Sequence, residues 1–391
     1  MTLRRRSSET MRVAINLLTD DPGNPSGAHW FWTRVIREMG DMLAEGEELA
    51  LVVGRRSKGM HQGYGRGVRY ITFPWANERR NLRTLSEQVY APVRLPLGRV
   101  DVFSTLIAPL VRPAPGVVAH IKTMHAFTTP DALNPAVRLY RSIGYPHTVK
   151  VADAVILNSE SLRAEVLRYL DVDPGKLRLI PEAVDHDVFR PGDPDAAAHR
   201  LRDRYGIGRP YVLFVSSLWP YKNCDGLIRA FAAARPHLAG HGLVVVGPGR
   251  DGAYAARLRS LADSLGVGDA ITWVGGVTLE ETVDFYRAAD VFVYPSHNET
   301  FGLPILEAMA CGCPVVTSDR TAMPETAGGA AVLADPDDPD SIASAILTAL
   351  EDGEALRARG LQRAGEFTWR HTAKRTLEVY REVHANRRGQ R

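Results

Sequence analysis

The segment DVFVYPSHNETFGLPILEAMACGCPVVTSD, residues 290–319, decides the fold class. Its apolar runs DVFVYPS and PVVTSD predict two buried strands, and residues 303–311 between them predict a helix. Pro304 suits the first helical turn, where its missing N–H would be unpaired anyway, and Gly312 suits the position after the helix, where a positive φ is favoured. Such a strand–helix–strand unit is typical of a parallel sheet covered by helices.

The same alternation runs along the whole chain in two series, separated by the Pro- and Asp-rich stretch DHDVFRPGDPDAA. The first series has expected strands at RVAINLL, ELALVVG, VRYITFP, VDVFSTL, VVAHIKTMH, DAVILNS and KLRLIPEA. The second has expected strands at YVLFVSSL, GLVVVGPG, AITWVGG, DVFVYPS, PVVTSD and AAVLADP. We therefore predict an α/β protein with two doubly wound, Rossmann-like domains facing across a cleft, and a ligand at the carboxyl ends of the strands.

The pattern also sets expected boundaries. They are a disordered tail at 1–11, an N-terminal domain at 12–187, a linker at 188–209, a C-terminal domain at 210–368 and a final helix at 369–391.

Composition restricts the class of protein. With 391 residues, 45% of them hydrophobic and 24% charged, the chain is expected to be soluble and globular. It contains no apolar run long enough for a membrane span, and its Arg-rich start lacks the apolar core of a secretory signal. The three cysteines Cys224, Cys311 and Cys313 are too few for a disulfide framework, which favours a cytoplasmic location.

The net charge of +3 is unevenly distributed. Residues 55–112 contain eleven Lys/Arg and three Asp/Glu, a net charge of +8 (11 − 3). Such a segment can attract phosphates or anionic lipid head groups, so peripheral contact with the inner membrane face is one expectation. A solvated basic surface is the equal alternative, and no nucleic-acid-binding motif accompanies the charge.

The start of the predicted helix at 303–311 has the features of an anion site. Backbone N–H groups near Phe301–Leu303 lie at the positive end of the helix dipole, and Gly302 allows an anion to approach the backbone. Glu299 precedes this site and Glu307 follows about one turn into the helix. The pattern fits a diphosphate ligand with hydroxyls on either side, although a surface loop with solvated glutamates would also produce it.

Several segments together resemble a known family. They are the E-x7-E pattern with FGLP inside it, EAMACGCPVV, SLWPYKN, ITWVGGVTLEETVDFYRAADVFVYPS, MPETAGGAAVLADPDD, the late FTW, NPSGAHWFWTRVIREM, TMHAFTTP and IPEAVDHDVFRP. In this order they resemble the retaining glycosyltransferases of family 4, group 1, in particular the mannosyltransferase-like branch, which have the GT-B fold. The resemblance covers nearly the whole chain and is stronger in the second half.

The resemblance implies a donor site in the second domain. Glu299 would lie beside the transferred sugar, Glu307 would hold the ribose hydroxyls, and Lys222 would neutralise the diphosphate. Phe301, Gly302 and Leu303 would face the sugar and phosphates, with Thr300 and Val277 in the same donor-binding set. Many family members carry an arginine five residues before this lysine, where the present chain has Ser217. Phosphate binding must then depend more on Lys222, the helix dipole or another cation such as Arg250, with Gly249 beside it.

The resemblance also implies an acceptor-binding first domain, to which the helix at 369–391 would cross back. Gly27 matches a loop that approaches the ligand, with a plain turn glycine as the alternative. His125 matches the central histidine of the family, and we expect it to end a strand and to orient a substrate or take a proton. Glu87 and Gln88 also resemble the family without an assignable role.

Two other motifs suggest different chemistry. GPGRDG, Gly247–Gly252, fits the dinucleotide pattern G-x-G-x-x-G, but it follows the second strand of its domain and lacks the expected downstream acid. HNE with CGCP suggests a zinc deaminase, but the required P-C-x-x-C is absent.

We therefore expect a retaining hexosyltransferase that uses a nucleoside-diphosphate sugar, no metal and no other cofactor. Its acceptor would be a glycan, a lipid-linked molecule or a small molecule, and no nucleic-acid partner is expected. A GT-B sugar-nucleotide epimerase, an NAD(P)-dependent oxidoreductase and a non-catalytic sugar-nucleotide-binding protein are the alternatives.

Overall fold

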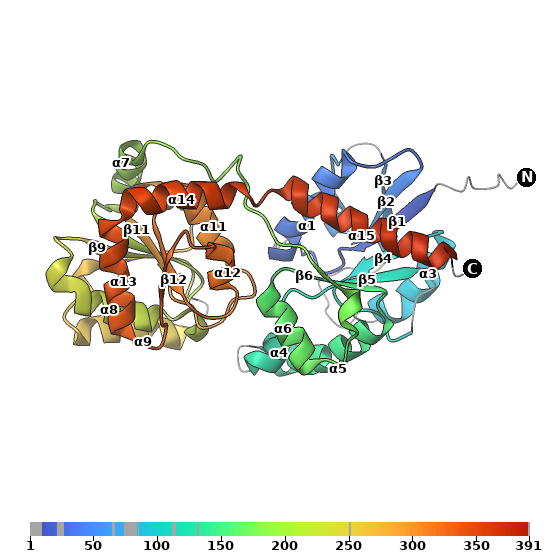
Figure 1. Cartoon of the computed structure of the whole chain (residues 1–391), viewed down its shortest axis with the longest axis horizontal. Helices are drawn as coiled ribbons and strands as arrows, with labels where there is room; N and C mark the ends of the chain where they lie inside the picture. The colour runs from blue at the N-terminus through green and yellow to red at the C-terminus, as the bar shows by residue number, and fades with distance from the viewer. Residues whose placement is uncertain are drawn as a thin grey trace, which may run out of the picture. The chain divides into compact units, whose positions relative to one another are not determined.

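The computed structural model describes residues 10–21, 27–64, 67–73, 84, 86–111, 115–130, 133–249 and 252–389 (Figure 1). The chain divides into two compact units, each built on one parallel sheet. Unit 1 comprises Met1–Pro181 and Trp369–Arg391, and unit 2 comprises Glu182–Thr368.

Unit 1 has a seven-stranded sheet in the order β3-β2-β1-β4-β5-β6-β7. The central strand β1 pairs in parallel with β2 on one side and β4 on the other, so the strand order reverses between β1 and β4. The inner strands β1, β2, β4, β5 and β6 are short and mostly buried, in agreement with their Val-, Ile- and Leu-rich sequences, whereas the edge strands β3 and β7 are more exposed. They are β1 (Met11–Asn16), β2 (Glu47–Gly54), β3 (Val68–Phe73), β4 (Val102–Thr105), β5 (Gly116–His120), β6 (Ala154–Leu157) and β7 (Leu177–Leu179).

The helices of unit 1 come from both ends of the chain. The terminal helix α15 packs on the first sheet: its Tyr380 donates a hydrogen bond to Ser104 (2.7 Å), and its Arg381 pairs with Glu47 (2.8 Å). The described helices are α1 (Gly27–Gly40), η1 (Ser57–Met60), η2 (Ser86–Tyr90), α3 (Ala91–Leu97), α4 (His125–Thr128), α5 (Pro135–Val151), α6 (Glu160–Tyr169), η4 (Pro174–Lys176) and α15 (Trp369–Gly389).

Unit 2 has a six-stranded sheet in the order β10-β9-β8-β11-β12-β13, and its strand order reverses between β8 and β11. The strands are β8 (Tyr211–Val215), β9 (Gly242–Val246), β10 (Ile271–Gly275), β11 (Val291–Tyr294), β12 (Val315–Ser318) and β13 (Val332–Ala334). The described helices are α7 (Pro194–Tyr205), η5 (Pro220–Lys222), α8 (Cys224–Ala234), η6 (Arg235–His237), α9 (Gly252–Ser264), η7 (Gly268–Ala270), α10 (Leu279–Ala288), α11 (Leu303–Ala310), α12 (Met323–Ala327), α13 (Pro339–Glu351) and α14 (Gly353–Gly365).

The stretch expected to be a linker, residues 188–209, differs from that expectation. It contains α7, and unit 2 already begins at Glu182. Asp193 caps α7 by accepting hydrogen bonds from the next turn, and Pro194 occupies the first helical position. Asp and Pro at these two positions start a helix, so a composition typical of loops here marks a helix N-terminus.

The expected tail at 1–11 also differs at its end. Residues 1–9 lie outside the described part, but Met11 is the first residue of β1 and pairs with Glu47. The Met11 side chain is buried in the core of unit 1, so the strand gains apolar contact by starting there. In the described parts of the chain, none of the helices combines the length and the apolar character needed to cross a bilayer.

Candidate active site

The candidate site is built where the strand order of unit 2 reverses, at the carboxyl ends of β8 and β11. β8 is followed by η5, which ends at Lys222, and β11 is followed by the loop that contains Glu299. The two connections are tied together because the backbone N–H of His297 and the hydroxyl of Ser296 both donate to the carbonyl of Tyr221 (2.8 and 2.9 Å). This reversal point is where open α/β sheets bind ligands.

Lys222, Glu299 and Tyr294 form a compact polar cluster at this point. The Nζ of Lys222 lies 2.5 Å from Oε1 of Glu299 and 2.7 Å from the hydroxyl of Tyr294, which itself donates to the same Oε1 (2.7 Å). The side chains of Lys222 and Glu299 are only 12% and 14% exposed. Burial lowers the pKa of Lys222, but Tyr294 and Glu299 beside it raise the pKa above its ordinary value. Lys222 is therefore a cation that is largely shielded from water.

Asn223 fixes the turn that presents Lys222. Its backbone adopts the left-handed conformation (φ 59°), and its side-chain amide donates to the carbonyls of Pro295 (3.0 Å) and Pro336 (2.7 Å). Its side-chain oxygen accepts from Gly226 and so caps α8. Sequence reasoning did not select Asn223 or Tyr294. Both residues lie in segments that carry the family resemblance, Asn223 at the end of SLWPYKN and Tyr294 in DVFVYPS.

The N-terminus of α11 has the geometry that the sequence predicts. Gly302 is its N-cap in the left-handed conformation (φ 94°), and no side chain of the described residues caps it. The carbonyl of Phe301 accepts a hydrogen bond from Thr326, which holds the approach to the helix. Gly312 follows the helix with φ 78°, which confirms the predicted helix end. The amide end of α11 can therefore stabilise negative charge.

Glu307 lies one turn inside α11. Burial raises its pKa to about 7, and a hydrogen bond from the hydroxyl of Tyr286 (3.2 Å) opposes this shift. A carboxyl group with this pKa changes its charge close to neutral pH. Tyr286, on α10, is a partner of the site that the sequence did not reveal.

Ser217, Gly249 and Val277 follow the neighbouring strands β8, β9 and β10 at the same edge of the sheet. The loops after β8 and β9 are in contact, because the N–H of Leu218 donates to the carbonyl of Pro248 (3.1 Å). Gly247 makes this approach possible: its φ is 138°, and a Cβ there would lie 1.9 Å from the carbonyl oxygen of Ser216. The remaining members of the donor set are Thr300, which follows Glu299 in the loop, and Arg250, which lies outside the described residues.

Gly27 and His125 belong to unit 1, whereas the donor set belongs to unit 2. Gly27 is the first residue of α1 and leaves open space around an added Cβ. His125 was expected to end a strand, and this was wrong. β5 ends at His120, whose partner in β6 is Ile156, and His125 instead begins the short helix α4. The apolar residues Ile121 and Met124 are buried without continuing the strand, so their pattern predicted too long a strand.

The structure also places the two motifs that suggested other chemistry, GPGRDG and HNE with CGCP. GPGRDG follows β9, the second strand of unit 2, as the sequence indicates, and part of it lies outside the described residues. Cys311 and Cys313 are free and buried. Within the described ranges, the only group of three or more His, Cys, Asp or Glu residues that could hold a metal is Asp20, His29 and His61, so no deaminase-like zinc group forms at CGCP.

Comparison with solved structures defines the class of fold. The sucrose-phosphate synthase of Thermosynechococcus elongatus superposes with a TM-score of 0.74 at 22% identity, covering 96% of this chain and 100% of that chain. HepE of Anabaena, solved with UDP and glucose, superposes with a TM-score of 0.71 at 20% identity, covering 95% and 100%. Together with the two parallel α/β units, these likenesses show that the chain has the GT-B fold.

Comparison of sequences then defines the family. The model for glycosyl transferases group 1 matches residues 197–364, and the model for Glycosyltransferase Family 4 matches residues 32–188. The D-inositol 3-phosphate glycosyltransferase of Kineococcus radiotolerans is 38% identical over 280 residues, which cover 67% of this chain and 63% of that relative. The chain belongs to the family 4, group 1 glycosyltransferases, which confirms the family that the sequence resembles. It spans less than two thirds of the length of this curated relative.

Proposed function

We propose that the protein transfers a sugar from a nucleoside-diphosphate sugar to a hydroxyl acceptor with retention of the anomeric configuration. The observation that carries this proposal is the shielded ion pair of Lys222 and Glu299 at the strand-order reversal of unit 2, with Glu299 in the loop that leads to the amide end of α11. A hexose is the proposed transferred group and the cytoplasm the proposed location.

The diphosphate would be held by the positive groups of this site. Lys222 is a cation, and α11 offers its N-terminal amides. The leaving nucleoside diphosphate gains negative charge as its bond to the sugar breaks, so groups already oriented toward it lower the barrier. Ser217 adds a hydrogen-bond donor but no charge. In this proposal Lys222 and α11 neutralise the diphosphate, and no metal or further cofactor is assigned to the transfer.

The two glutamates would recognise opposite ends of the donor. Glu307 would accept hydrogen bonds from the ribose hydroxyls, with Tyr286 holding its carboxylate in place. Glu299 would lie beside the sugar, where its negative charge stabilises the positive anomeric centre that develops as the nucleotide leaves. Phosphate binding would give Lys222 a second anionic partner and loosen its contact with Glu299, which frees Glu299 to meet the sugar.

The acceptor would bind to unit 1, with Gly27 and His125 among the residues near it. The name of the Kineococcus relative identifies an inositol phosphate as the acceptor of that protein. A phosphorylated polyol is therefore one acceptor class to test here, beside glycans and lipid-linked molecules. The basic charge of residues 55–112 favours an anionic acceptor.

A lipid-linked acceptor is supported by an apolar surface on unit 1. Val89, Val93 and Leu97 follow each other at four-residue spacing through η2 and α3, and they are 59%, 62% and 70% exposed. Leu139 and Ile143 on α5 and Leu110 and Val111 in the loop after β4 are also exposed. Gln88 links these elements, because its side chain contacts Tyr140 of α5 (3.4 Å) and the backbone of Leu110 (2.7 Å).

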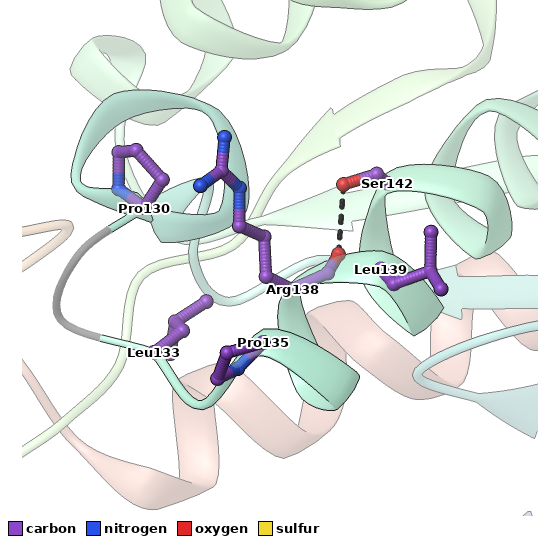
Figure 2. Close-up of a pocket in the computed structure, with 6 residues that line it drawn as sticks. All are labelled: Pro130, Leu133, Pro135, Arg138, Leu139 and Ser142. Carbon is purple, nitrogen blue, oxygen red and sulfur yellow. Dashed lines mark hydrogen bonds between the residues drawn. The ribbon is translucent and has the colours of Figure 1, made fainter.

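A hollow of about 530 Å³ adjoins this surface between the end of α4 and α5 (Figure 2). Its lining combines apolar side chains with one cation, and Figure 2 shows Ser142 hydrogen-bonded to the backbone of Arg138. The lining residues are Pro130, Leu133, Pro135, Arg138, Leu139 and Ser142. We propose that this surface contacts an anionic membrane in which the acceptor is carried.

Flotation with anionic and with neutral vesicles tests the membrane contact. Binding to anionic vesicles only, and its loss in the double variant Val93→Ser/Leu97→Ser, would support the proposal. Leu265→Ser, an exposed leucine of unit 2, is the matched control. Absence of binding to anionic vesicles would exclude the membrane and leave a water-soluble acceptor.

A thermal-shift series with UDP, GDP, dTDP, ADP, NAD and NADP tests the donor site. Stabilisation by one nucleoside diphosphate, lost in Glu307→Ala, is the expected result. Stabilisation by NAD or NADP alone would instead support an oxidoreductase. In the transfer assay Glu299→Ala should be inactive although folded, and full activity would remove the central claim. Conversion of the sugar nucleotide without any acceptor would identify an epimerase, and tight binding without turnover would identify a non-catalytic binding protein.

A further inference from the structure

Unit 1 contains a buried polar cluster that the proposed transfer reaction does not use. It brings together Asp20 from the loop after β1, His29 from the first turn of α1 and His61 from the residue after η1. Asp20 and His61 are 0% exposed and His29 is 7% exposed. Three side chains that can carry charge are thus enclosed in the protein interior, where an uncompensated charge is costly.

The donor atoms of the three side chains converge on one point. Oδ2 of Asp20 lies 3.0 Å from Nδ1 of His29 and 2.9 Å from Nε2 of His61. Each residue offers one ligand atom, and these atoms all lie within 4.8 Å of one another. A tetrahedral metal ion with bonds of about 2.0–2.2 Å to imidazole nitrogen and carboxylate oxygen places its ligand atoms about 3.3–3.6 Å apart. The two distances to Oδ2 of Asp20 are a few tenths of an ångström shorter, so a small outward shift of the side chains would accommodate the ion.

The second nitrogen of His61 has a hydrogen-bond partner outside the cluster. Nδ1 of His61 lies 3.1 Å from the hydroxyl of Tyr64. Nε2 has no hydrogen bond in favourable geometry to any described residue, although Oδ2 of Asp20 is 2.9 Å away. If Nδ1 carries the proton toward Tyr64, the Nε2 lone pair faces a carboxylate oxygen. A cation between them would turn this repulsion into attraction, and a ring nitrogen bonded to a partner outside the site is the usual arrangement of a metal-binding histidine.

We propose that Asp20, His29 and His61 bind one divalent transition-metal ion of the Zn²⁺ class. Two imidazoles and one carboxylate form a donor set that suits Zn²⁺ better than Mg²⁺ or Ca²⁺, which prefer oxygen ligands. Three protein ligands leave one coordination position for water. The metal ion would join Asp20 and His29, which lie on either side of Gly27 in the sequence, to His61 after η1. It lies in unit 1 and takes no part in the charge neutralisation assigned to Lys222 in unit 2.

Direct metal binding tests the proposal independently of enzyme activity. The full chain is stripped with a chelator, dialysed and titrated with Zn²⁺ by calorimetry, and Co²⁺ is used in parallel as a spectroscopic probe of coordination. The expected result is one ion per chain, a rise in Tm on metal addition, and Co²⁺ absorption bands typical of four-coordinate nitrogen and oxygen ligation.

Four variants distinguish a metal site from a hydrogen-bonded cluster. Asp20→Asn, His29→Gln and His61→Gln should each weaken Zn²⁺ affinity by about 100-fold or more, and Tyr64→Phe, which keeps all three ligands, by about 10-fold to 100-fold. His147→Gln is the matched control, because this half-buried histidine of unit 1 contacts only the carbonyl of Pro109 in the described contacts. No stoichiometric binding by the wild-type chain, or unchanged affinity in all the ligand variants, would overturn the proposal. A variant that fails to fold is replaced by the others, each of which tests a separate ligand.

Discussion

The two sheets of the protein reverse their strand order in the same way, but they place different chemistry at the reversal. In unit 2 the point between β8 and β11 holds a cation and a carboxylate, Lys222 and Glu299. In unit 1 the point between β1 and β4 holds Asn16, the last residue of β1, whose amide donates to Glu87 (3.3 Å) and Thr105 (3.2 Å). Among these contacting groups, the reversal point of unit 2 holds a lysine cation beside a carboxylate, whereas that of unit 1 holds an amide, a hydroxyl and a carboxylate.

This difference fits the proposal that one topology serves two halves of a reaction. A positive charge beside a helix N-terminus suits a phosphate-bearing donor. Neutral polar groups and a carboxylate suit the hydroxyls of an acceptor, because both can form hydrogen bonds with hydroxyl groups. The topology therefore provides the location in each unit, and the side chains at the ends of the strands provide the specificity.

Removal of the Lys222 cation should have the largest effect on activity. Lys222→Ala should lower the turnover number by about 100-fold to 1000-fold, because it removes the charge that stabilises the leaving diphosphate. The measurement is the initial rate of sugar transfer at saturating donor. Lys374→Ala, an exposed lysine of α15, is the control and should retain the wild-type rate. Equal rates in Lys222→Ala and the wild type would show that the donor phosphate is not held at this point.

Substitution at the other reversal point should affect the acceptor instead. Glu87→Gln should raise the KM for the acceptor about 10-fold to 30-fold and leave the KM for the donor unchanged, since it weakens a charge-assisted hydrogen bond. Tyr140→Phe is a companion variant, because its hydroxyl lies 3.5 Å from the Glu87 carboxylate. If both KM values rise together with a fall in Tm, Glu87 only supports the end of β1, and the two halves are not specialised as we propose.

The pH dependence of donor binding is the smallest of the three expected effects. Burial raises the pKa of Glu307 to about 7, so the carboxyl group is mostly protonated at pH 6 and mostly ionised at pH 8. The ionised form accepts hydrogen bonds from ribose hydroxyls, so donor affinity should increase by several-fold, at most about tenfold, as pH rises from 6 to 8. Calorimetry with the nucleoside diphosphate identified by thermal shift measures this change.

Glu307→Gln is the control for this titration, since it keeps the shape of the side chain and removes its charge. The variant should bind the nucleotide with a weaker pH dependence, due only to the phosphate of the ligand itself. The same dependence in the variant and in the wild type would assign the titration to another group and contradict the ribose role of Glu307.

Much of unit 2 could be predicted because its signals are local. Val291–Tyr294 and Val315–Ser318 are the continuous apolar strands that the segment at 290–319 indicates, and Pro304 and Gly312 mark the two ends of α11. The errors arose where one local pattern has two structural meanings. Asp193 and Pro194 read as a linker but start α7, and the apolar run around Ile121 continues into the core without remaining a strand.

The sequence by itself determined the alternation of strands and helices and the family, and it singled out Lys222, Glu299 and Glu307 as candidates, because these inferences depend on neighbouring positions and on the order of motifs along the chain. Only the tertiary structure decided that Tyr294 joins Lys222 and Glu299 in one polar cluster, that Asn223 holds the turn beside it, and that Asp20, His29 and His61 meet in the interior of unit 1. Lys222 and Glu299 are 77 positions apart and touch only because β8 and β11 are neighbours in the sheet. Contacts across adjacent strands depend on the order in which strands pair, and that order is set by the packing of the whole domain.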